Sequence, residues 1–139
     1  MTSSCLGETH YFSLMQEVKA DGWSRRDGLF YELPVQDSLS LYHIDIVGRL
    51  RYNYAPDSLS LLLRVEAPSG EWFCDTIHFG LLHAHDRLWE DFRFDYCSHL
   101  CFTQKGIWRF ELRHNANADI LKGVSAIGFY INKEKNGKK

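Results

Sequence analysis

Five histidines and cysteines between residues 83 and 101 have side chains that commonly bind transition metals and lie close together in the sequence. Cys97, His99 and Cys101 alternate along the chain, so in a regular β-strand all three would project from one face, and His83 and His85 lie upstream. Zinc takes such side chains in tetrahedral sets of three or four. However, alternate Cα atoms of a strand lie about 6.6 Å apart, and the chain has no Cys-x-x-Cys pair. We therefore predict core cysteines beside a surface histidine, with no metal and no cofactor.

Carboxylates could supply general acid and base groups if the fold paired two of them across a cleft. The candidates are Asp75, Asp86, Glu90, Asp91 and Asp95. No spacing selects a pair among them, and exposed strand and loop carboxylates are common. The chain also lacks a nucleophile elbow, a phosphate-binding glycine loop and a helix-borne His-Glu pair. We predict that the protein is not an enzyme.

The clearest predicted strand, residues 58–66, is the starting point for locating the other strands that would hold these side chains. In Ser58–Glu66, Leu59, Leu61, Leu63 and Val65 recur at every second position, which is typical of a strand with one apolar face. Turn-forming residues flank it on both sides, at 54–58 and 67–71. We expect 41–54 to be its partner strand and 72–79 to follow it. Further strands are predicted at residues 10–18, 29–33 (ended by Pro34), 92–96, 100–102, 107–113 and 124–132.

About eight strands without a sustained helical period predict an all-β fold, an antiparallel β-sandwich that is jelly-roll-like. The 139 residues, 45% of them hydrophobic, suffice for one domain and not for two. We place this β-sandwich domain at residues 9–132, after an N-terminal tether at 1–8 and before a disordered basic tail at 133–139.

Charge and hydropathy argue against a nucleic-acid partner and against a membrane-spanning segment. The net charge of −2, with no basic cluster before the tail, gives no case for nucleic acid. No window approaches the roughly 18 apolar residues of a membrane span, and there is no complete secretory signal, so the chain as written is expected to be soluble.

A jelly roll can hold sugars on aromatic side chains assisted by a few polar groups. The residues that could form such a ligand or partner surface are Trp72, Arg87, Trp89, Arg93, Asp95 and Tyr96. The interpretation we favour for the two tryptophans is that Trp72 packs across strands and Trp89 holds its loop against the core. Exposure distinguishes the two: coplanar exposed aromatics favour sugar binding, and buried ones favour a scaffold that meets protein partners.

The start of the chain, Met1-Thr2-Ser3-Ser4-Cys5, places two small residues before a cysteine. This pattern is similar to the end of a bacterial lipoprotein signal whose apolar part is not included. On these residues alone an ordinary free cysteine is favoured, and Cys5 as the lipid-carrying residue is the alternative.

Six segments together resemble the gliding-motility lipoprotein family GldH. They are residues 22–27 (GWSRRD), 29–34 (LFYELP), 49–54 (RLRYNY), 75–79 (DTIHF), 105–112 (KGIWRFEL) and 120–128 (ILKGVSAIG). Each is short, and their order and spacing carry the resemblance, from about Cys5 to about Asn132.

The resemblance implies a lipid-anchored protein of the bacterial cell envelope, attached through Cys5 and associated in some bacteria with gliding machinery. We accordingly expect a non-enzymatic accessory or interaction component whose partners are the membrane, through its lipid anchor, and other envelope proteins. The alternative is a carbohydrate-binding surface lipoprotein with an aromatic platform. In an envelope compartment Cys74 could pair with Cys97 or Cys101, or these two with each other if the chain turns at Ser98.

Overall fold

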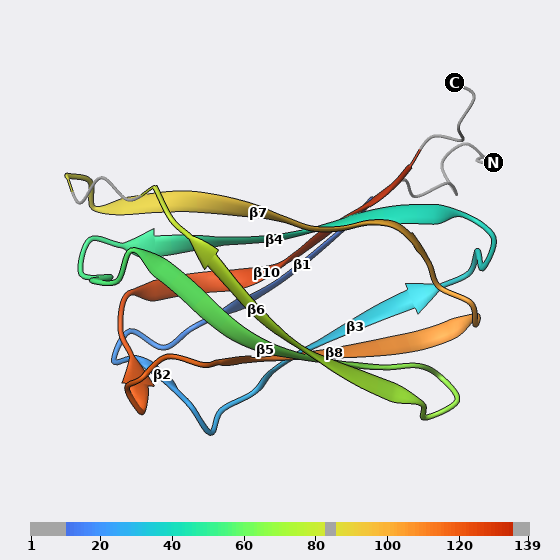
Figure 1. Ribbon diagram of the computed structural model, residues 1–139, viewed down its shortest axis with the longest axis horizontal. Helices are drawn as coiled ribbons and strands as arrows, with labels where there is room; N and C mark the ends of the chain where they lie inside the picture. The colour runs from blue at the N-terminus through green and yellow to red at the C-terminus, as the bar shows by residue number, and fades with distance from the viewer. Residues whose placement is uncertain (1–10, 83–85, 135–139) are drawn as a thin grey trace.

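Two four-stranded antiparallel sheets pack face to face in the computed structural model, which describes residues 11–82 and 86–134 (Figure 1). The first sheet has the order β1 (Tyr11–Glu17), β10 (Val124–Lys133), β4 (Leu41–Arg51), β7 (Trp89–Cys101). The second has the order β3 (Leu29–Val35), β8 (Gly106–His114), β5 (Ser58–Glu66), β6 (Trp72–Gly80). A short ribbon joins β2 (Trp23–Ser24) to β9 (Ile120–Leu121). The described residues include no helix that could span a membrane.

The strand pairing is nested. β1 pairs with β10, β2 with β9, β3 with β8, β4 with β7 and β5 with β6. The chain therefore resembles one long hairpin that is rolled into two sheets, which is the jelly-roll arrangement. This confirms the predicted antiparallel, jelly-roll-like sandwich, with two short strands added to the eight long ones.

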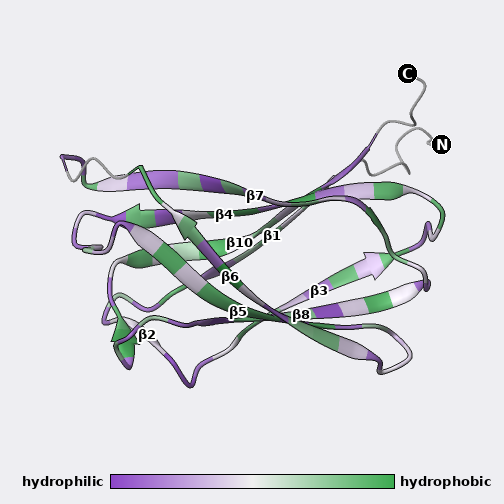
Figure 2. Cartoon of the chain, in the orientation of Figure 1, coloured by the Kyte–Doolittle hydropathy of each residue, from purple (hydrophilic) through white to green (hydrophobic). Residues whose placement is uncertain are grey.

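Alternation along the strands builds the core between the two sheets. Leu59, Leu61 and Leu63 of β5 are buried, as are Ile127 and Phe129 of β10, in agreement with the predicted apolar faces. Figure 2 shows the same pattern as alternating hydrophobic and hydrophilic bands along the strands. Each sheet therefore turns one apolar face towards the other.

Three local predictions are wrong. The predicted partnership of 41–54 with β5 fails, because β4 lies in the first sheet and β5 in the second. Pro34 lies within β3 and does not end it. This is tolerated because β3 is an edge strand, where a missing N–H costs no ladder hydrogen bond on its open side. The predicted strands 92–96 and 100–102 are parts of one strand, β7.

His114 is a titratable residue within the core. Its side chain is fully buried, and its ring contacts Trp23 edge-on, with ring centroids 5.5 Å apart. Nδ1 accepts a hydrogen bond from the Ala116 N–H at 3.2 Å, and Nε2 lies 3.2 Å from the Asp119 carbonyl oxygen, so the neutral imidazole is satisfied. Burial lowers the pKa of His114 below its usual value. Backbone hydrogen bonding with Asp119 and Trp23 partly opposes this shift, and the Arg25 cation adds to it.

We expect stability to fall as the pH drops below about 6.5, where an unfolded histidine takes up a proton that the folded state resists. Thermal melts between about pH 8 and pH 5 measure this loss. His114→Gln should be less stable at pH 8 but should lose less stability across that range. An equal loss in both proteins would contradict the assignment to His114.

Candidate functional site

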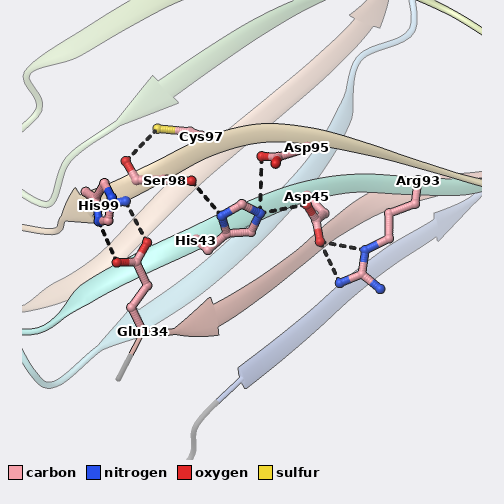
Figure 3. Close-up of polar contacts among 8 residues, drawn as sticks. All are labelled: His43, Asp45, Arg93, Asp95, Cys97, Ser98, His99 and Glu134. Carbon is pink, nitrogen blue, oxygen red and sulfur yellow. Dashed lines mark hydrogen bonds and ion pairs between the residues drawn. The ribbon is translucent and has the colours of Figure 1, made fainter. Parts of the chain in front are cut away.

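The outer face of the first sheet carries a cluster of polar residues around His43 (Figure 3). His43 Nε2 lies 2.9 Å from Asp45 Oδ1 and 3.2 Å from Asp95 Oδ1. His43 Nδ1 lies 2.8 Å from the Ser98 hydroxyl. Arg93 donates to Asp45 Oδ2 from Nε, at 2.6 Å. We call His43, Asp45, Arg93, Asp95 and Ser98 the β4–β7 cluster.

Two irregularities in β7 bring this cluster together. One extra residue of β7 lies between the pairs Tyr42↔Leu100 and Ile44↔Cys97, and another lies between Ile44↔Cys97 and Asp45↔Asp95. In a regular strand, residues 95 and 98 would face opposite ways. Bulges re-aim side chains, and here Asp95 and Ser98 both reach His43.

The same irregularities separate the three residues first considered as zinc ligands. His99 adopts a positive φ of 57° and contacts Glu134 through Nδ1, at 2.7 Å. Cys97 and Cys101 instead line a groove between the sheets, and the Cys101 thiol lies 3.1 Å from the Ser38 carbonyl oxygen. The common face that a regular strand would give is therefore absent. His99 is exposed, as predicted for a surface histidine, and Cys97 and Cys101 are partly buried. His83 and His85 lie outside the described residues.

The disulfides considered among Cys74, Cys97 and Cys101 are not formed in this structure. Cys74, Cys97 and Cys101 are all free thiols in this structure. Burial raises the pKa of Cys97, and the carboxylates of Glu134, Asp75 and Asp95 raise it further. The thiol form is therefore favoured over the reactive thiolate.

The groove between the sheets has a volume of about 390 Å³ and opens between the edge strands β6 and β7. Its lining is mostly apolar and includes Phe73, Tyr96, Leu100 and Trp108. The Tyr96 hydroxyl donates to Asp75 Oδ2 at 2.6 Å and so links the two edge strands. Burial raises the pKa of Tyr96, and this carboxylate raises it further, so the phenol stays a donor.

The residues predicted as a ligand surface lie in four places, one of which is Trp89 beside Arg49. Arg93 and Asp95 belong to the β4–β7 cluster, Tyr96 and Trp72 line the groove, and Arg87 is exposed before β7. Trp72 and Trp89 are 59% and 55% exposed, and each has an arginine against its ring.

The two tryptophans lie on different sheets. Arg64 of β5 covers the Trp72 ring at 4.7 Å, and Arg49 of β4 covers the Trp89 ring at 5.6 Å. Arg49 also donates to Asp91 at 2.7 Å, which lowers the pKa of that carboxyl. Neither tryptophan is buried, and they do not form one platform with each other.

Sequence reasoning missed His43 and Asp45. A signal was present, because the two residues are separated by one position in a predicted strand and so share a face. Asp95 could not be added without knowing that it lies opposite Asp45.

The comparison with protein families decides what the chain is related to. Residues 10–131 match the family model described as GldH lipoprotein. The chain belongs to the GldH lipoprotein family. The comparisons with curated proteins and with solved structures give no significant match.

In this GldH lipoprotein, the segments that carried the resemblance mainly build the scaffold. Trp23 is buried, and its indole N–H donates to the Asp27 carbonyl oxygen at 2.8 Å. Phe110 and Leu112 belong to the core. The β4–β7 cluster lies outside all six segments, so the resemblance says nothing about its chemistry.

Proposed function

We propose that this GldH lipoprotein is a non-enzymatic, lipid-anchored component of the cell envelope that binds other envelope proteins. The observation that supports the proposal most directly is the aromatic edge of β6. Trp72 and Phe73 open this strand and are 59% and 51% exposed. Within the described residues β6 pairs only with β5, so its other edge is open to a partner strand. Exposed aromatic residues are enriched at protein interfaces.

The anchor belongs to the same proposal. Cys5 lies outside the described residues, and the name of the family supports its assignment as the lipidated residue. Cys5 and Tyr11 are six residue steps apart, so at most about 22 Å of fully extended chain can separate them. Lipidation at Cys5 would therefore hold the start of β1 close to the membrane surface. By the strand registers, this is also the end where β4 begins and β7 finishes.

The absence of catalysis is supported by how the candidate groups are engaged. Asp75 accepts from Tyr96, Asp91 accepts from Arg49, and Asp95 lies against His43. Each of these three carboxylates thus has a stabilising partner, and the groove between the sheets is lined mainly by apolar side chains.

Carbohydrate binding is the second candidate and stays a prediction. Trp72, Phe73 and Tyr96 lie together along one groove, which supports aromatic contact with a sugar. Trp89 is not part of that groove lining. Any sugar surface would therefore depend on the Trp72 end of β6.

Photo-crosslinking in a lipoprotein-processing bacterium tests the main proposal. A photoreactive residue at Phe73 of the full precursor should give crosslinks to envelope proteins, and the same residue at Phe30 serves as control. Phe30 is a matched site because it is 62% exposed on β3, away from the groove. With Cys5→Ala, the acyl mass, membrane fractionation and crosslinks from position 73 should all be lost. Equal crosslinking from both positions, or acylation unchanged by Cys5→Ala, would refute the proposal.

A further inference from the structure

The His43 side of the β4–β7 cluster has three metal-ligating atoms in close reach. They are His43 Nε2, Asp45 Oδ1 and Asp95 Oδ1, and all three lie within 4.8 Å of one another. Ligand atoms held 2.0–2.1 Å from a tetrahedral zinc ion lie about 3.3 Å apart. The distances of 2.9 Å and 3.2 Å from His43 Nε2 to the two carboxylates are close to that spacing. Two of the three spacings therefore suit a shared ion, and the third, between the two carboxylate oxygens, is at most 4.8 Å.

The placement of the two carboxylates favours a cation between them. Asp45 and Asp95 are directly opposite each other on β4 and β7, and like charges in this position destabilise a sheet. Arg93 compensates one charge through Asp45 Oδ2. With His43 neutral, the cluster keeps a net negative charge.

The surroundings of the three atoms resemble the outer shell of a metal site. The Ser98 hydroxyl can accept from Nδ1–H of His43, which leaves the Nε2 lone pair directed at the two aspartates. Arg93 holds Asp45 by Oδ2 and leaves Oδ1 on the His43 side (Figure 3). Metal-bound histidines usually have their second nitrogen fixed in this way, and ligating carboxylates are themselves hydrogen-bonded.

We propose that His43, Asp45 and Asp95 bind a divalent transition-metal ion, with Zn²⁺ as the best-matched probe. An imidazole with two carboxylates suits zinc, whereas Mg²⁺ and Ca²⁺ prefer all-oxygen sites. The side chains of His43, Asp45 and Asp95 are 28%, 6% and 74% exposed, so the site is anchored at Asp45 and open at Asp95. Three protein ligands leave a coordination position free on this open side.

The competing explanation is a metal-free triad in which a protonated His43 pairs with both aspartates. The other groups facing this triad come from β10 and the residue that follows it. Tyr130 lies opposite Asp45, Asn132 lies opposite His43, and Glu134 contacts His99. A metal ion can bind Nε2 only where no proton occupies that atom. The metal-free triad instead gives no saturable zinc binding at any pH.

Zinc competition titrations on the full chain test the proposal. Wild type should bind one Zn²⁺ saturably, and His43→Gln and Asp95→Asn should each weaken that binding by at least about tenfold. Asp91→Asn is the matched control, because Asp91 is also exposed on β7 and pairs with Arg49 outside the triad. Mg²⁺ should not compete.

A second measurement identifies the ligand atom. Long-range ¹H–¹⁵N spectra should show zinc shifting the Nε2 resonance of His43 while Nδ1 keeps its proton. Thermal melts verify that the variants are folded. We expect Asp95→Asn to fold, because it removes only one exposed charge from a like-charged pair. Binding that survives both substitutions belongs to other histidines or cysteines and overturns the proposal, as does a lack of saturable binding.

Discussion

Replacing Phe129 with alanine should lower the free energy of unfolding by about 3–5 kcal/mol. Phe129 comes from β10 of the first sheet and is fully buried. Its ring contacts Tyr31 and Phe110 of the second sheet, with centroid distances of 5.1 Å to each. Its loss leaves a cavity between the sheets, because the rolled chain cannot collapse locally around the missing ring. Urea denaturation followed by circular dichroism measures the change.

Phe30→Ala is the control for that substitution. It removes the same side chain from β3, where Phe30 is 62% exposed, so its cost should stay near or below about 1 kcal/mol. If the two variants lost similar stability, Phe129 would not hold the sheets together as described.

Gly128→Ala should destabilise the protein by about 1–3 kcal/mol and loosen β1 first. Gly128 lies opposite Met15 in the pairing of β10 with β1. A Cβ atom at this position would collide with the Leu14 carbonyl oxygen and come within 2.9 Å of Met15 Cα. Both are backbone atoms, so a rotamer change cannot relieve the clash, and β1 must move away from β10.

Hydrogen exchange locates this second effect. Amides of β1 should exchange faster in Gly128→Ala, while those of β5 change less. Gly80→Ala is the matched control, since a Cβ there meets nothing within 4 Å and Gly80 is also a strand residue. Equal melting curves and equal β1 exchange in the two variants would contradict the proposed close approach.

The strands could be predicted well because their signal is local. In β5 the buried apolar residues fall at every second position, with Leu62 exposed between two of them, and β8 and β10 show a similar alternation. The prediction at Pro34 failed because its effect depends on whether β3 is central or at an edge. The partner of β5 was also predicted wrongly, since adjacency in sequence does not say whether the chain crosses between sheets.

The candidate site was less predictable than the fold. In a regular strand Cys97, His99 and Cys101 would share a face, and the irregularities of β7 with the positive φ of His99 turn them apart. Those same irregularities bring Asp95 and Ser98 to His43. Nothing in the local pattern of 89–101 marks where the extra residues fall.

The sequence by itself determined the alternating strands, the all-β class and the resemblance that the match to the GldH lipoprotein family confirms. These follow from residue types at short range and from the order of motifs. Only the tertiary structure decided the nested pairing, the groove between β6 and β7 and the meeting of His43 with Asp45 and Asp95. Register is fixed by contacts between distant strands, and one extra residue reverses the face that a side chain occupies.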